Sequence, residues 1–244
     1  MPRPSRIAVS VLLAAPALMW PVPARAAEDW NKPPFPNWSD STIARVVTDS
    51  PWAKRRTVPL EWRKREERPF SPSDVPGTGP NANKPFGSPV GGIGVPRTSL
   101  PYTADILIRW ASALPVRQAK ALYRQRDGKL DPSKIEELTG PPESDYVLEI
   151  YGVPAEVAHR GTGSIEALAV ASVTMRTARG RVIKPGSAEA KLTGSTLTIL
   201  VHFPRTVALE RKDEEIECRG DFQIFRFAER FKLSSMMYLG RLEL

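Results

Sequence analysis

Side chains that commonly bind metals or form disulfides are scarce in this sequence. The 244 residues include one cysteine, Cys218, and two histidines, His159 and His202. A single cysteine excludes a disulfide within the chain. Zinc needs three or four ligands, so carboxylates would have to complete a site, and the histidines are not at a metal-ligand spacing. We expect no metal and no other cofactor. We expect Cys218 to be buried, with an intermolecular disulfide or a reactive thiol as the alternative.

Recognisable catalytic motifs are also absent from the sequence. It contains no G-x-S-x-G elbow of the kind that presents a nucleophilic serine. The stretch Gly91–Gly94 lacks the preceding strand, the following helix and the Lys-Ser/Thr pair of a phosphate-binding loop. Paired carboxylates such as Glu136 and Glu137 lie in charged stretches. A Ser-His-acid triad stays open, because its members are often remote in sequence.

Long hydrophobic runs are missing except at the start of the chain. Residues 1–6 carry two arginines and no acid, residues 7–20 are largely apolar, and residues 24–26 read Ala-Arg-Ala. This is the layout of a cleavable signal peptide. The apolar run spans about 21 Å as a helix, which is shorter than the ~30 Å hydrocarbon core of a membrane. We expect cleavage after Ala26, a secreted protein in the periplasm or outside the cell, and no transmembrane segment in residues 27–244.

Charge of one sign is only modestly in excess. The chain has 35 Lys and Arg against 27 Asp and Glu, and three of the 35 lie in the predicted signal peptide. This balance is not typical of a nucleic-acid-binding protein, so we expect no nucleic-acid partner. The excess is local, because residues 54–68 contain seven basic and three acidic side chains.

This basic segment has a tryptophan between its two groups of positive charge. Cationic side chains attract an acidic polymer and an aromatic ring can stack on it. We therefore predict that the segment binds an anionic cell-envelope polymer or an envelope protein. The residues predicted to bind it are Arg55, Arg56, Arg63, Lys64, Arg65 and Trp62. In the alternative interpretation, the tryptophans anchor the segment on the rest of the protein and the charges are solvated.

Composition divides the chain into four parts. The signal peptide, residues 1–26, is followed by a Trp-rich basic arm over residues 27–68. Residues 69–100 are rich in proline and glycine and are predicted to be a disordered linker. Residues 101–244 are predicted to form a globular domain.

The arm contains one clear helical pattern. A helix is predicted to begin near Ser39 or Asp40, with apolar residues on one face, and to end at Pro51. We expect Trp38 and Trp52 to pack on the globular domain.

Hydrophobic periodicity in residues 101–244 predicts an α+β fold. Helices are predicted over residues 115–125 and 132–139. Strands are predicted over residues 106–110, 145–151, 167–177, 196–203, 214–218, 222–233 and 242–244. Residues 167–177 have a helix as the alternative, and residues 219–221 are the predicted hairpin turn. Early helices and late strands with short connections favour a largely antiparallel sheet with one or two helices.

Several stretches resemble a group of exported bacterial proteins to which no activity is assigned. They are Trp38–Asp40, Asp49–Ala53, Ile108–Arg117, Phe203–Arg205, Phe231–Leu233 and Gly240–Leu244. The resemblance covers about a third of residues 27–244 and implies no cofactor and no catalytic residue. It supports treating the arm and the C-terminal domain as one unit.

The sequence favours a non-enzymatic function. We expect an exported binding or envelope-associated protein that uses its α+β domain as a scaffold. The alternative is a secreted hydrolase without a recognisable motif. A pocket that gathers His159 or His202 with a serine and a carboxylate would favour the hydrolase, whereas scattered, exposed histidines would count against it.

Overall fold

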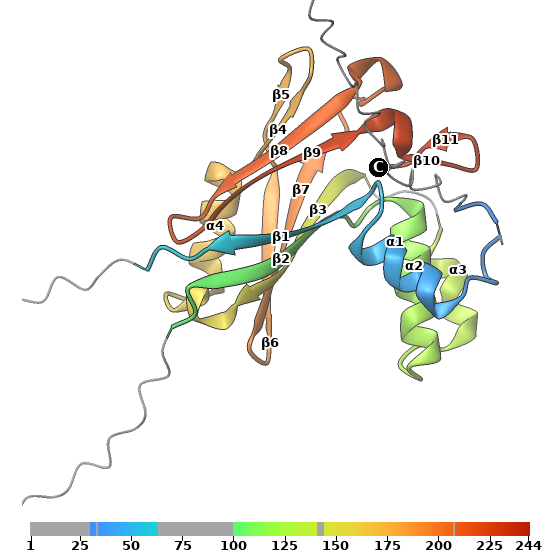
Figure 1. Cartoon of the computed structure of the whole chain (residues 1–244), viewed down its shortest axis with the longest axis horizontal. Coiled ribbons are helices and arrows are strands. Elements are labelled where there is room, and N and C mark those ends of the chain that lie inside the picture. Colours follow the sequence, from blue (N-terminus) through green and yellow to red (C-terminus); the bar gives the residue numbers. More distant parts are fainter. Residues whose placement is uncertain (1–29, 33, 63–99, 141–143, 207) are drawn as a thin grey trace, which may run out of the picture.

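The protein is described by a computed structural model over residues 30–32, 34–62, 100–140, 144–206 and 208–244 (Figure 1). The predicted signal peptide, residues 69–99 of the predicted linker, and Arg63, Lys64 and Arg65 lie outside the described residues. The described chain combines helices with antiparallel sheets, which confirms the predicted α+β class.

The larger sheet has five strands within the described residues, in the order β1-β2-β3-β7-β6, and every neighbouring pair is antiparallel. Its strands are β1 (Ala53–Pro59), β2 (Thr103–Trp110), β3 (Asp145–Pro154), β7 (Thr196–Pro204) and β6 (Ser187–Thr193). Strand β1 comes from the segment that composition assigns to the N-terminal arm. The arm and the C-terminal part of the chain therefore share one sheet.

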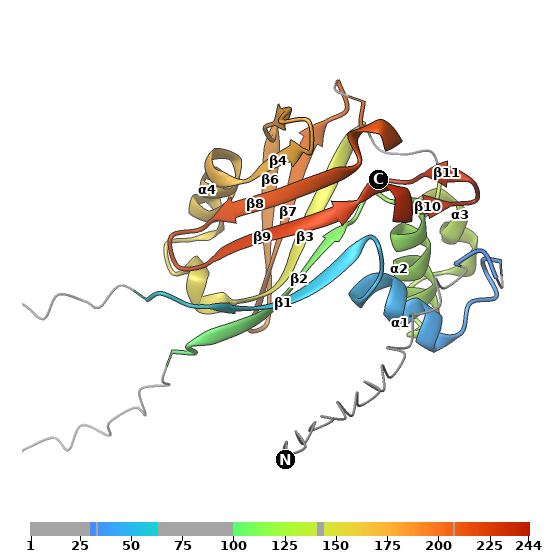
Figure 2. The same cartoon turned by 45° about the horizontal axis from the view of Figure 1, so that its top comes forward.

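A smaller sheet has four strands in the described chain, in the order β5-β4-β8-β9. They are β5 (Val182–Ile183), β4 (Thr174–Thr177), β8 (Glu215–Asp221) and β9 (Arg226–Lys232). A short hairpin of β10 (Met237–Tyr238) and β11 (Arg241–Leu242) follows. In Figures 1 and 2, β8 and β9 cross over β3 and β7, so the two sheets face one another.

The core lies between the facing sheets because β2, β3 and β7 each have an apolar side. Trp110 of β2 and Phe231 of β9 meet edge to face, with ring centroids 5.9 Å apart. Strand β7 shows the predicted alternation, and its fully buried side chains are Leu197, Ile199, Val201 and Phe203. Burial of this apolar area, at about 25 cal/mol per Å², is the main favourable contribution to folding.

Two helices pack on each other at one end of the larger sheet. Helix α1 (Asp40–Thr48) begins where the side chain of Ser39 accepts a hydrogen bond from the Thr42 N–H at 3.1 Å. Helix α2 (Leu114–Arg126) has a proline in its first turn. Both helices, and the short helical stretch η2 (Pro132–Lys134) with α3 (Ile135–Leu138), confirm the predicted positions.

The strand predicted over residues 167–177 is wrong for its first part. Residues 162–172 form helix α4 (Thr162–Ser172), and only Thr174–Thr177 form strand β4. Alternating alanines in residues 167–171 favour a helix. Ile165 and Ala169 are four residues apart and both turn toward the core.

The hairpin turn predicted at residues 219–221 is also wrong, because these residues belong to β8. The turn follows at residues 222–225. Position 220 lies inside the strand. It is occupied by glycine because the ring of Phe227 fills the space that a side chain would need. A Cβ at position 220 would lie 2.4 Å from Cε1 of Phe227.

The predicted packing of Trp38 and Trp52 is confirmed. Both side chains are fully buried. The Trp52 Nε1–H donates to the carbonyl of Glu243 at 2.8 Å, and both rings contact the ring of Tyr238 edge to face. In the described part of the chain, no helix has the length and apolar character needed to span a membrane.

Candidate functional site

A cavity of about 780 Å³ opens at the end of the molecule opposite α1 and α2. Its walls come from the 3-10 turn η3 (Ala155–Ala158), from α4, from the turn between β8 and β9, and from the segments that follow β1 and precede β2. The lining residues are Trp62, Leu100, Glu156, Val157, His159, Arg160, Ser164, Ile165, Ala167, Leu168, Ala171, Phe222, Gln223 and Ile224.

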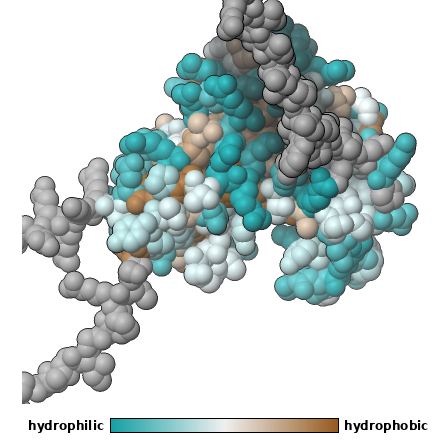
Figure 3. All heavy atoms as spheres, in the orientation of Figure 1, coloured by the Kyte–Doolittle hydropathy of each residue, from teal (hydrophilic) through white to brown (hydrophobic). Residues whose placement is uncertain are grey.

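Apolar side chains make up most of the wall. Ile165 and Leu168 come from one face of α4, and Val157 comes from η3. Phe222 and Ile224 come from the turn between β8 and β9. Figure 3 shows hydrophobic surface at this end of the molecule, on the left, between hydrophilic side chains. The cavity therefore offers an apolar ligand a place out of water.

The turn at the rim of the cavity is held in a defined shape. Gln223 has a φ of 64°, in the left-handed region, and its N–H donates to Oδ1 of Asp221 at 2.8 Å. The Phe222 N–H donates to the Phe225 carbonyl at 2.9 Å. The rings of Phe222 and Phe225 stack with centroids 4.7 Å apart. These contacts fix the Phe222 side chain as part of the wall.

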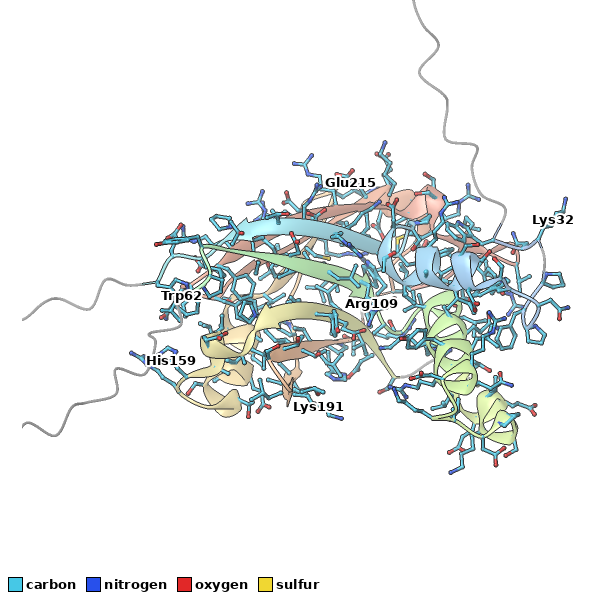
Figure 4. The ribbon with its side chains drawn as sticks, turned by 60° about the horizontal axis from the view of Figure 1, so that its bottom comes forward. Lys32, Trp62, Arg109, His159, Lys191 and Glu215 are labelled. Carbon is cyan, nitrogen blue, oxygen red and sulfur yellow. The ribbon has the colours of Figure 1, made fainter. Side chains whose placement is uncertain are left out.

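The mouth of the cavity is where the strand pair β1–β2 ends. The Leu60 N–H donates to the Tyr102 carbonyl at 2.8 Å. Beyond it, the Trp62 Nε1–H donates to the Pro101 carbonyl at 2.7 Å. The half-buried Trp62 ring and the exposed Leu100 then line the cavity. Figure 4 shows Trp62 and His159 at the same end of the molecule.

Polar side chains enter the cavity mainly from residues 156–164. Glu156, His159, Arg160 and Ser164 all line it. The Ser164 hydroxyl donates to the Arg160 carbonyl at 3.1 Å, a bond along the helix, and not to His159. His159 is exposed. A histidine, a serine and a carboxylate thus share the cavity without the serine–histidine bond of a nucleophilic triad.

Of the six residues predicted to bind an anionic partner, the structure describes Arg55, Arg56 and Trp62, and these three are placed differently from one another. Trp62 lines the cavity. Arg55 is exposed on β1, opposite Leu107 of β2. Arg56 points to the other face of the sheet and forms an ion pair with Glu229 of β9, with Nη2 3.2 Å from Oε2. Within the described residues, the structure does not bring Arg55, Arg56 and Trp62 together on one surface.

His202 and Cys218, the other two side chains considered for catalysis or metal binding, do not line the cavity. His202 is on β7, with Nε2 3.8 Å from Oε1 of Glu189 on β6. Cys218 is buried in β8, as predicted, and burial raises the pKa of its thiol. No group of three or more His, Cys, Asp and Glu side chains within the described ranges is arranged to hold a metal ion.

A buried charge cluster lies on the outer face of the larger sheet, and sequence reasoning missed it. Glu149 of β3 accepts from Nε and Nη2 of Arg109 at 2.7 and 2.8 Å, and from Nζ of Lys120 at 2.9 Å. Burial alone would raise the pKa of Glu149, but these bonds and charges lower it to about 2. Burial lowers the pKa of Lys120.

This cluster connects α2 to the larger sheet, because Lys120 belongs to α2 and Glu149 to β3. Arg109 and Glu149 are directly opposite in the β2–β3 register, and the ring of Tyr151 lies 5.8 Å from the Arg109 guanidinium. In the sequence, the charged Arg109 stands between the apolar Ile108 and Trp110. This alternation indicates that the strand has a second, charged face. The strand register that pairs it with Glu149 is not visible in a single sequence.

The cavity, with its apolar wall and its polar groups at residues 156–164, is the candidate functional site. Comparison of the chain with protein-family models, with curated proteins and with solved structures found no match.

Proposed function

We propose that this chain is an exported, non-enzymatic binding protein that holds an apolar or amphiphilic small molecule in the cavity between α4 and the β8–β9 turn. The observation that carries the proposal is the cavity itself, with about 780 Å³ of space and a largely apolar wall. Export rests on the N-terminal sequence pattern of residues 1–26.

The dimensions and composition support binding of a small molecule. Ligand sites in proteins commonly enclose about 300–1,000 Å³ and combine apolar walls with a few polar groups. An apolar ligand in this site would cover side chains such as Leu168 and Ile224 that otherwise face water. Each Å² of apolar surface removed from water contributes about 25 cal/mol.

A fluorescent hydrophobic probe tests the proposal. N-phenyl-1-naphthylamine is titrated into residues 27–244, and binding is followed by its emission. Ala171→Phe places a ring in the cavity and should weaken binding about tenfold or more. Val170→Phe is the matched control, because Val170 is exposed on the same helix and does not line the cavity. Equal binding by wild type and both variants would refute the proposal.

A secreted hydrolase is the second candidate, favoured by one observation. Glu156, His159 and Ser164 line the same cavity, which is the grouping that the sequence left open. The Ser164 hydroxyl donates to Arg160, so a nucleophilic role requires that bond to be exchanged for one to His159. Hydrolysis of p-nitrophenyl esters that is lost in both Ser164→Ala and His159→Gln would establish this function. Turnover that is absent, or unchanged in these variants, would exclude it.

A further inference from the structure

The cavity has a polar side and an apolar side, and this division indicates which kind of ligand fits it. Four of its polar side chains come from one stretch of nine residues, 156–164, at the end of η3 and the start of α4. The remaining segments contribute apolar side chains, except for Gln223. A ligand that fills this space meets polar groups on one side and apolar groups elsewhere. That arrangement suits an apolar chain with a single polar head group.

Arg160 brings the largest set of hydrogen-bond donors among these polar groups. The guanidinium of Arg160 carries five N–H donors and a permanent positive charge, and His159 supplies at least one more donor. Glu156 is the one carboxylate among the lining residues of the described chain. Arg160 is exposed at the rim and takes part in none of the ion pairs of the described residues. Among the residues that the structure describes, no carboxylate therefore competes with a ligand for its donors.

We infer that the cavity takes a single-chain amphiphile with an acidic head group, whose carboxylate or phosphate oxygens bind Arg160 while its alkyl chain lies against Ile165, Leu168 and Phe222. This inference rests on the proposed function of the cavity as a binding site for an apolar ligand. The planar guanidinium matches the two oxygens of a carboxylate or phosphate and forms charge-assisted hydrogen bonds with them. Glu156, four residues before Arg160, sets a limit on the affinity by repelling the same head group.

Isothermal titration calorimetry with matched probes tests the inference. Dodecanoate, dodecyl phosphate, dodecanol and dodecylammonium share one alkyl chain and differ in the head group, and each is used below its micelle concentration. The acids should bind the wild-type chain about tenfold more tightly than dodecanol, and dodecylammonium most weakly. The ratio of dodecanoate to dodecyl phosphate affinity separates a fatty-acid type of ligand from a phosphate ester.

Two variants that each remove one charge test the roles of Arg160 and Glu156 separately. Arg160→Gln should weaken binding of both acids about tenfold to a hundredfold and leave dodecanol within about threefold. Glu156→Gln should instead tighten binding of the acids by a few fold. Both positions are exposed, so both variants should keep the melting temperature of the wild type.

The possible failures point to different conclusions. If Ala171→Phe blocks all four probes but head group and Arg160→Gln make no difference, the acidic head group is refuted and the apolar site stands. If dodecylammonium binds most tightly and Glu156→Gln weakens it, the site is cationic-ligand selective and the inference is likewise refuted. If none of the probes responds to Ala171→Phe, the proposed function itself fails.

Discussion

Arg56 on β1 and Glu229 on β9 form an ion pair that joins the edges of the two sheets. The Glu229 side chain is only 3% exposed, whereas that of Arg56 is 59% exposed. The ion pair raises the pKa of Arg56. Nearby, the Glu61 N–H donates to the Ile224 carbonyl at 2.7 Å. Strand β1 belongs to the predicted N-terminal arm and is part of the larger sheet. These contacts connect this segment to the smaller sheet as well.

Removal of the Arg56 side chain should therefore lower stability more than removal of its neighbour. Arg56→Ala leaves the buried carboxylate of Glu229 without its partner and should cost about 2 kcal/mol. For a domain of this size, that cost lowers the melting temperature by about 4–8 °C. Arg55→Ala, on the exposed face, should stay within about 0.5 kcal/mol. Equal effects of the two variants in urea titrations would contradict this account of the pair.

The cluster around Glu149 should make stability fall in acid. Its pKa is about 2 in the folded protein, below its ordinary value of 4.5. A carboxyl whose pKa is lowered by folding contributes stability above its unfolded pKa and loses it as the pH falls through the folded pKa. The contribution, about 3 kcal/mol at pH 7, should therefore disappear between about pH 5 and pH 2.

Chemical denaturation at several pH values measures this loss. Glu149→Gln should be strongly destabilised at pH 7, because Arg109 and Lys120 then lack their carboxylate. Near pH 2 the variant and the wild type should converge. A constant difference between them from pH 7 to pH 2 would show that Glu149 does not supply the pH dependence.

Gly220 should tolerate no side chain. A Cβ at this position would lie 2.4 Å from the Phe227 ring and 3.2 Å from the Phe222 ring. Gly220→Ala must displace these rings and should cost about 1–3 kcal/mol. Since Phe222 is part of the cavity wall, the variant should also weaken binding of the fluorescent probe. Gly163→Ala, with open space around the position, is the control that should lose neither stability nor probe binding.

Residues 63–99 should be replaceable by a short turn. The hydrogen bonds from Leu60 to Tyr102 and from Trp62 to Pro101 hold the two ends of this segment together. Closing a shorter loop costs less entropy, by about 0.6 kcal/mol for each halving of its length. A five-residue Gly/Ser replacement should therefore stabilise the protein by about 2 kcal/mol in denaturant titrations. A loss of stability would show that residues 63–99 contribute contacts of their own.

Helices and strands with a strong hydrophobic periodicity could be predicted from the sequence. Strands that form only because they pair with another strand could not. Strand β7 alternates apolar and polar residues over its whole length, and α1 has both a capping serine and an apolar face. Strand β6 is a largely exposed edge strand with few apolar residues, so its pattern resembles a loop. Its pairing with β7 and its cover by α4 become visible only in three dimensions.

The candidate site could not be predicted for a similar reason. Its walls combine Trp62 and Leu100 with residues 156–171 and 222–224, segments that are far apart in the sequence. Sequence reasoning selected Trp62 because of the charges around it, and the structure places its ring at a largely apolar cavity. Sequence reasoning considered His159 as a possible member of a Ser-His-acid group. Neither residue carries a local signal of the cavity, because that signal lies in the packing of α4 beside the β8–β9 turn.

The bond from Trp52 to Glu243 links positions 191 residues apart and has a consequence for synthesis on the ribosome. Trp52 also contacts Tyr238, and Leu244 is buried. A growing chain therefore holds an incomplete core until residues 238–244 have been made. Nascent chains that lack residues 238–244 should stay sensitive to protease, and the core should form only once these residues have left the ribosome. Until then, chaperones have time to bind the unfolded chain.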